Sequence, residues 1–140
     1  MKIIFLCVAN SARSQIAEGL ARNIFPAHIQ VESAGSEPSG AVNPFAIEVM
    51  REIKIDISQS HSKFYDQLPP SFLAGIDFVI SMCAEEVCPA MVRARAQKLR
   101  WPFPDPAAAI GTHEEKLDAF RTVREQIRQK ILEFQKIKAP

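Results

Sequence analysis

The apolar residues Ile3-Ile4-Phe5-Leu6 run directly into Cys7-Val8-Ala9-Asn10-Ser11-Ala12-Arg13-Ser14, after which a helical pattern begins. Because the stretch from Lys2 to Leu6 is continuously apolar after its first residue, it is typical of a buried strand in a parallel sheet. This strand brings Cys7 into a short loop that leads into a helix. The amides of such a loop and the start of the helix carry positive partial charge. The stretch therefore predicts an anion-binding loop.

Cys7 and Arg13 have the residue types and the spacing to attack and hold one tetrahedral oxyanion. The guanidinium group of Arg13 would bind two oxygens of the anion in a bidentate manner. The same positive field would lower the pKa of Cys7 from about 8.5 toward neutrality. Alternatively, Cys7 is a small buried side chain at the end of a strand. The predicted anion-binding residues are Val8, Ala9, Asn10, Ser11, Ala12, Arg13 and Ser14.

Length and composition limit the classes of protein that fit. With 140 residues, of which 47% are hydrophobic, we expect a single domain over residues 1–140. The net charge of +1 gives no basic surface for nucleic acid or a membrane, so anion recognition must be local. No run has the length of a signal-peptide core or a transmembrane span, and we expect a cytoplasmic monomer.

Strands and helices alternate along the chain. The predicted strands are residues 2–6, 29–33, 78–82 and 97–101, and the predicted helices are residues 14–25, one opening at Asn43-Pro44, and one from a Thr112 cap to Lys136. Short helical turns are expected at residues 63–67 and 85–87 in otherwise irregular segments. This alternation predicts an α/β three-layer sandwich with a four-stranded parallel sheet. Ligands bind such sheets beyond the carboxyl ends of the strands.

Three segments that carry reactive groups follow predicted strands and should converge at that edge: Cys7, Cys83 and the proline-rich loop 102–106. Asp105 lies in this rigid loop, where a carboxyl group can protonate the leaving oxygen of an oxyanion. The alternative is that Asp105 only forms a turn before a proline, which is a frequent arrangement.

The three cysteines argue against a disulfide-stapled secreted scaffold, and no further ligands complete a zinc site. Four residues separate Cys83 from Cys88, which suits a disulfide if the Cα atoms lie within about 7 Å. If Cys83 also reaches Cys7, the three cysteines can pass oxidation along by thiol–disulfide exchange. The alternative is that Cys83 belongs to the core and Cys88 has no role.

Three polar residues around the loop have both structural and functional interpretations. Asn10 can adopt a left-handed backbone conformation or bond loop carbonyls. Ser14 can donate to the Cys7 thiolate, or cap the helix. Glu18 can brace the loop, or face solvent.

Residues 7–18 resemble the anion loop of low-molecular-weight protein tyrosine phosphatases, which have a flavodoxin-like fold. Gln15 and the segments 32–38 and 42–44 are more similar to the arsenate reductases built on that fold. Val79-Ile80-Ser81-Met82-Cys83, together with Cys88-Pro89, resembles the redox segment of the thioredoxin-coupled reductases. Trp101 with Asp105-Pro106 resembles their acid loop.

The resemblance implies a reaction sequence. Cys7 attacks arsenate held by Arg13 and the loop amides, and Asp105 protonates the leaving oxygen. Cys83 then attacks Cys7 and releases arsenite, after which Cys88 attacks Cys83. Thioredoxin or another thiol donor reduces the final disulfide. The catalytic set is therefore Cys7, Arg13, Cys83, Cys88 and Asp105. No cofactor is expected beyond a structural potassium ion, which some relatives bind through residues matching Asn10, Glu18 and Ser33.

Two departures and one alternative accompany this resemblance. The best-known thioredoxin-coupled reductases have six residues between their relay cysteines instead of four, which leaves the thiol donor open. Ala12 replaces a cysteine that is common in both families but lies outside the relay. The alternative function is a phosphatase that hydrolyses phosphotyrosine or small phosphate esters through a cysteinyl-phosphate on Cys7. Ala107, where phosphatases usually place tyrosine, favours the reductase.

Overall fold

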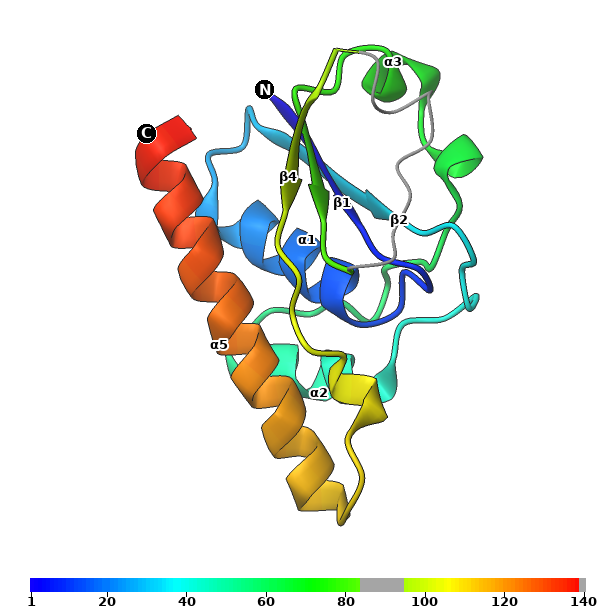
Figure 1. Ribbon diagram of the computed structural model, residues 1–140, viewed down its shortest axis with the longest axis vertical. Coiled ribbons are helices and arrows are strands. Elements are labelled where there is room, and N and C mark those ends of the chain that lie inside the picture. The colour runs from blue at the N-terminus through cyan, green and yellow to red at the C-terminus, as the bar shows by residue number, and fades with distance from the viewer. Residues whose placement is uncertain (84–94, 139–140) are drawn as a thin grey trace.

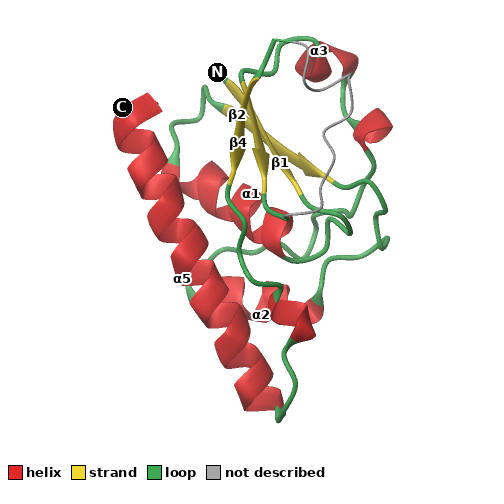
Figure 2. Cartoon of the chain, in the orientation of Figure 1, coloured by secondary structure: helices red, strands yellow, loops and turns green. Residues whose placement is uncertain are grey.

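The structure is a computed structural model that describes residues 1–83 and 95–138 (Figure 1). Its described strands are β1 (Lys2–Leu6), β2 (Gln30–Ala34), β3 (Phe78–Ser81) and β4 (Gln97–Arg100). They form one parallel sheet in the order β2-β1-β3-β4 (Figure 2). The predicted four-stranded parallel sheet is confirmed, and the expected strand ends differ from the observed ones by at most one residue.

Helices and turns cover both faces of the sheet. The described helices are α1 (Arg13–Ile24), α2 (Pro44–Glu52), α3 (Pro70–Leu73) and α5 (His113–Lys138), with 3-10 turns at Tyr65–Gln67 and Pro106–Ala108. The turn expected within residues 63–67 is present, whereas α3 lies where no helix was predicted. The turn expected at residues 85–87 lies outside the described residues. Along the described part of the chain, no helix is long and apolar enough to cross a membrane.

Strand β1 is buried on both faces, which explains its continuous apolar sequence. Ile3 and Phe5 belong to a large core that is built with α1, α2 and α5. Ile4 and Leu6 belong to a second cluster on the opposite face, which includes Tyr65, Leu68, Phe72 and Ile76. The two clusters make the three-layer sandwich that the alternation of elements predicts.

Side chains cap the starts of α2 and α5 but not the start of α1. The side chain of Asn43 accepts a hydrogen bond from the Phe45 amide at 2.8 Å and caps α2. Thr112 accepts from the Glu115 amide at 3.2 Å at the start of α5. By contrast, α1 begins after Ala12 without a side-chain cap. Its first amides therefore stay available at the end of the anion-binding loop.

An ion-pair network joins α2 to α5 at the surface. The Glu52 carboxylate accepts hydrogen bonds from Arg121 at 2.8 Å and from Arg124 at 2.9 Å. The hydrogen bonds from Arg121 lower the pKa of Glu52 below its ordinary value of 4.5. A carboxyl group with a lowered folded-state pKa stabilises the fold above its unfolded pKa, and this contribution is lost as the pH falls through the folded pKa.

We predict that Glu52→Gln lowers the free energy of unfolding by about 0.5–1 kcal/mol at pH 7, since the pairs are partly solvent-exposed. The loss should shrink as the pH falls through the lowered pKa of Glu52, because the wild-type carboxyl group then becomes protonated as well. Urea unfolding at pH 7 and at an acidic pH below that pKa measures this difference. Glu133→Gln, an exposed change on α5, is the control. An equal loss at both pH values would contradict the ionic origin.

Candidate active site

The loop between β1 and α1 turns its carbonyl groups outward. The carbonyl oxygens of Val8, Ala9 and Ser11 accept hydrogen bonds from the amides of Glu37, Ser39 and Asn43 at 2.9, 3.0 and 2.9 Å. Because the N–H of a trans peptide points opposite to its C=O, the following amides are directed into the loop. The loop is therefore held from outside and leaves donors inside, as an anion-binding loop requires.

A glycine is required at position 35, directly after β2, because the chain there lies very close to the backbone of this loop. A Cβ atom at Gly35 would lie 2.4 Å from the Val8 carbonyl oxygen and 2.6 Å from that of Cys7. Backbone atoms cannot move aside cheaply at such distances. The absence of a side chain at Gly35 thus lets the anion loop lie directly against the segment that follows β2.

We predict that Gly35→Ala displaces the anion loop and costs about 1–3 kcal/mol of folding stability, which is typical of overpacking. Inorganic phosphate binding, measured by isothermal titration calorimetry, should weaken at least tenfold. Gly75→Ala is the matched control, since a Cβ there meets the flexible Lys2 ammonium at 2.9 Å. If Gly35→Ala bound phosphate as tightly as the control, the close approach would not be what shapes the loop.

Asn10 is fully buried and adopts the left-handed conformation with φ 48°. Its side-chain oxygen accepts from the Lys63 amide at 2.9 Å and from the Gln15 side chain at 3.0 Å. Its side-chain nitrogen donates to the hydroxyls of Ser14 at 2.8 Å and Ser33 at 3.0 Å. Asn10 thus supports the loop from behind with both ends of its amide.

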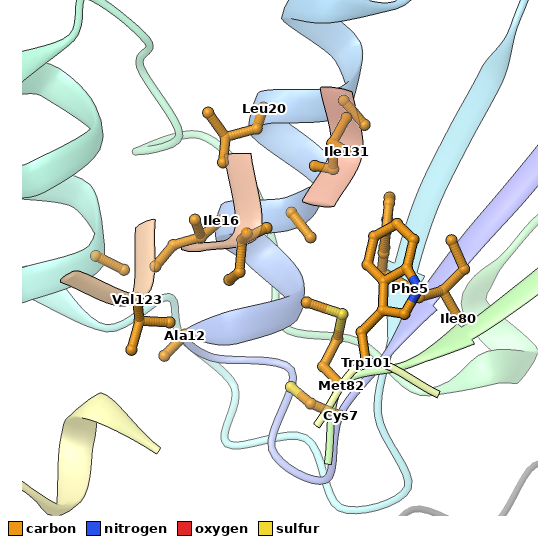
Figure 3. Close-up of a cluster of buried hydrophobic side chains, with 14 of the residues drawn as sticks. Phe5, Cys7, Ala12, Ile16, Leu20, Ile80, Met82, Trp101, Val123 and Ile131 are labelled. Atoms are coloured by element: carbon orange, nitrogen blue, oxygen red, sulfur yellow. The ribbon is translucent and has the colours of Figure 1, made fainter. Parts of the chain in front are cut away.

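Cys7 lies at the end of the main core, where Figure 3 shows it beside Met82 and Trp101. Its pKa is lowered from 9.0 to about 6, chiefly because the Cys83 thiol donates a hydrogen bond to its sulfur. Burial opposes this shift, while the Ser14 hydroxyl, with its oxygen 2.8 Å from the sulfur, and the amides of Ser14 and Asn10 add to it. These donors therefore favour the thiolate form of Cys7 at neutral pH.

Cys83 follows β3, the parallel neighbour of β1, and leaves the sheet at the same edge as Cys7. Donation to the Cys7 thiolate and burial raise the pKa of Cys83, so this sulfur keeps its proton. The amide of Val8 is directed at the same sulfur. The two cysteines thus form one buried pair that consists of a thiolate and a thiol. Cys88 lies outside the described residues.

A cavity of about 330 Å³ opens in front of Cys7 and is also lined by Arg13, Asp105 and Ala107. Arg13 donates to the Phe103 carbonyl at 2.7 Å, which ties the anion loop to the segment before Asp105. The Asp105 carboxylate accepts from the Ala107 amide at 3.0 Å and starts the turn that follows it. Asp105 therefore caps a turn and also faces the cavity, so the two interpretations of this residue are compatible.

The predicted anion-binding residues divide into two groups. Five of them line the cavity, namely Val8, Ala9, Ser11, Ala12 and Arg13. Asn10 and Ser14 are buried behind the loop, where their amides and the Ser14 hydroxyl face the Cys7 sulfur. They act on the nucleophile instead of forming the wall of the cavity.

Residues 61–63 form a rear support of the loop that sequence reasoning missed. The His61 carbonyl accepts from Gln15 at 2.8 Å, the Ser62 hydroxyl donates to the Ala9 carbonyl at 2.9 Å, and the Lys63 amide holds Asn10. These contacts join residues about 50 positions apart. A polar, irregular segment carries no periodicity that would reveal them.

The residues expected to hold potassium lie together but do not fit that ion. The backbone amide of Lys63 donates a hydrogen bond to the side-chain oxygen of Asn10. The side-chain NH₂ group of Asn10 therefore faces the Ser33 hydroxyl. The Ser33 hydroxyl donates to Glu18 at 2.7 Å. The ammonium nitrogen of Lys63 lies 3.5 Å from the same carboxylate oxygen, so the cationic position is already filled.

We predict that Ser14→Ala raises the pKa of Cys7 by about one unit, because a hydrogen bond to a charged group is lost. The rate of Cys7 alkylation by iodoacetamide, followed by mass spectrometry across pH 5–9, gives the midpoint. Ser71→Ala, an exposed serine, is the control. An unchanged midpoint in Ser14→Ala would mean that its hydroxyl does not donate to the sulfur.

A thiolate in an anion-binding loop, an arginine beside it and a carboxyl group on the next loop define a thiolate-dependent oxyanion site on a parallel α/β sandwich. The chain belongs to the low molecular weight phosphotyrosine protein phosphatase family, whose model matches residues 2–138. This finding confirms the family resemblance inferred from the sequence.

Several relatives of the chain are named as arsenate reductases. The chain is 44% identical over 134 residues to an arsenate reductase of Halalkalibacterium halodurans, covering 94% of this chain and 93% of that one. It is 41% identical over 134 residues to an arsenate reductase of Bacillus subtilis, with the same coverage of 94% and 93%. A solved structure described as an arsenate reductase in the phosphate binding state superposes with a TM-score of 0.79, at 34% identity and 95% coverage of both chains.

Proposed function

We propose that the protein reduces arsenate to arsenite, with Cys7 as the nucleophile and Cys83 and Cys88 as the thiols that follow it. The observation that carries this proposal is a second buried, free thiol, Cys83, which leaves the sheet at the same edge as Cys7 and lowers its pKa. Ester hydrolysis needs no second thiol at the nucleophile, whereas reduction of arsenic(V) needs two thiols that can form a disulfide. The arsenate reductases among the relatives support the same activity.

In the first half of the reaction, arsenate occupies the cavity in front of Cys7. The loop amides, the uncapped start of α1 and Arg13 bind its oxygens. The Cys7 thiolate attacks arsenic and forms a sulfur–arsenic bond. Asp105 gives a proton to the departing oxygen, which leaves as water.

In the second half, the charge relationship between the two cysteines reverses. While Cys7 is a thiolate, Cys83 stays protonated because it donates to that charge. Once the Cys7 sulfur is bonded to arsenic, that charge is gone and the pKa of Cys83 falls. The Cys83 thiolate then attacks the Cys7 sulfur. A disulfide forms, the electron pair of the sulfur–arsenic bond goes to arsenic, and arsenic(V) leaves as arsenic(III) in arsenite.

Cys88 completes the cycle in this proposal. Its thiolate attacks Cys83, frees the Cys7 thiolate and leaves a Cys83–Cys88 disulfide. Thioredoxin or another thiol donor then reduces that disulfide to two thiols. A reducing compartment supplies such donors, so we place the protein in the cytoplasm.

We predict that one equivalent of arsenate removes two of the three free thiols of the reduced protein. Cys88→Ser should release one arsenite and stop as a Cys7–Cys83 disulfide, whereas Cys83→Ser should release none without an added thiol. Thiol titration, arsenite analysis and mass spectrometry measure these outcomes, and phosphate in place of arsenate is the control. Full turnover in both variants with thioredoxin, its reductase and NADPH would contradict the proposed three-cysteine relay.

Phosphate ester hydrolysis is the second candidate, because Cys7, Arg13 and Asp105 line one cavity and suffice for that reaction. The family to which the chain belongs takes its name from this activity. An aryl phosphate distinguishes the two functions on the same variants. A wild-type protein that hydrolyses the ester rapidly, while arsenate leaves all three thiols intact, establishes the phosphatase.

A further inference from the structure

Behind the anion loop lies a carboxylate that is buried and therefore needs a permanent partner. The Glu18 residue is only 3% exposed. A buried charge is tolerated when it is paired and hydrogen-bonded. Lys63 and Arg22 each place a nitrogen 3.5 Å from one of its oxygens, but the Arg22 side chain is 51% exposed and the Lys63 side chain 15%. Arg22 also binds Glu32, at 3.3 Å. Lys63 is thus the better shielded of the two partners.

Glu18 lies at one end of a hydrogen-bond chain that ends at Cys7, and the chain has a fixed direction. The Ser33 hydroxyl donates to Glu18, so its oxygen accepts from the Asn10 amide. The second hydrogen of that amide goes to the Ser14 oxygen at 2.8 Å. Because the Ser14 oxygen is occupied as an acceptor, its own proton is available for the Cys7 sulfur 2.8 Å away.

Lys63 contacts the hydrogen-bond chain and the segment beside it through three groups. Its backbone amide donates to the Asn10 side-chain oxygen at 2.9 Å and thereby orients the amide that directs both serines. Its carbonyl accepts from the Gly35 amide at 3.0 Å, which fixes the segment beside the loop. Its ammonium group binds the His61 carbonyl at 3.3 Å and the Glu18 carboxylate.

We propose that Lys63 is a positioning residue whose ammonium is the built-in counter-ion of Glu18, so that the Ser14 hydroxyl is held on Cys7 without a bound metal cation. The inference rests on the proposed role of Cys7 as the nucleophile and adds a residue that acts on it through Glu18, Ser33, Asn10 and Ser14. It also accounts for the poor fit of potassium to these residues. The reactivity of Cys7 should therefore be the same in potassium and in choline salts.

The test follows the Cys7 thiolate directly, without arsenate. Iodoacetamide alkylates the reduced wild type and Lys63 variants at pH 6, and mass spectrometry follows the Cys7 peptide. If loss of the ammonium raises the pKa of Cys7 by about one unit, the rate falls about fivefold. We expect this fall in Lys63→Ala and Lys63→Met, and a near wild-type rate in Lys63→Arg. Lys136→Met, an exposed lysine on α5, is the control.

Chemical rescue separates a counter-ion from a packing role. The Lys63 side chain lines an open cavity of about 320 Å³, through which ethylammonium can enter. Ethylammonium chloride should restore the alkylation rate of Lys63→Ala but not that of Lys63→Met, whose side chain fills the space. Lys63→Met combined with Glu18→Gln should react faster than Lys63→Met alone, because no unpaired carboxylate remains.

Three results would overturn the proposal. Lys63→Met could be alkylated as fast as the wild type, or ethylammonium could fail to raise the alkylation rate of folded Lys63→Ala. The third is a wild-type protein that is alkylated faster in potassium chloride than in choline chloride. Circular dichroism establishes whether each variant is folded. If Lys63→Ala does not fold, the comparison of Lys63→Met with Lys63→Met/Glu18→Gln tests the proposal instead. Arsenate-dependent thiol loss is measured separately on the wild type. Its failure would refute the proposed function and leave the alkylation result standing.

Discussion

Cys7 carries its negative charge where burial alone would keep the thiol protonated, since the residue is 4% exposed. Hydrogen-bond donors reverse that preference: the Cys83 thiol, the Ser14 hydroxyl and the amides of Ser14 and Asn10. Each donor comes from a different constraint of the fold. The Cys83 thiol follows the end of the neighbouring parallel strand, and the Ser14 hydroxyl lies on the first turn of α1. The Asn10 amide is placed by a left-handed backbone conformation. The architecture around the sheet edge therefore favours the deprotonated form of Cys7.

The same interaction assigns different roles to two chemically identical side chains. A thiol that donates to a thiolate has its own pKa raised, so in the proposed reaction Cys7 attacks first and Cys83 stays protonated until then. A covalent bond at Cys7 removes the charge that kept Cys83 protonated. In the proposed reaction, the attack of Cys7 on arsenic therefore activates Cys83 for the second attack. The order of the two steps follows from this change of charge.

Much of this arrangement could be predicted from the sequence, because it follows from local patterns and one topological rule. A continuous apolar run predicts β1, and parallel strands carry Cys7, Cys83 and Asp105 to one edge. The rear support could not be predicted, since Gln15 and Lys63 reach residues 46 and 53 positions away. Gly35 lies in a segment that carries the family resemblance, but its close approach to the loop backbone is visible only in three dimensions. The role of Cys88 stays a prediction.

Selection between arsenate and phosphate cannot come from the cavity, because the two anions have nearly the same shape and charge. Under the proposed function, Arg13 and the loop amides bind both anions by the same hydrogen bonds. The difference lies after binding, since attack by a thiol on a sulfur–arsenic bond can leave its electron pair on arsenic, whereas phosphorus(V) is not reduced by thiols. In the proposed function, the buried Cys83 thiol is thus the group that turns a general oxyanion site into one whose product depends on the central atom. Phosphate would then compete for the cavity and would not be a substrate of the proposed relay.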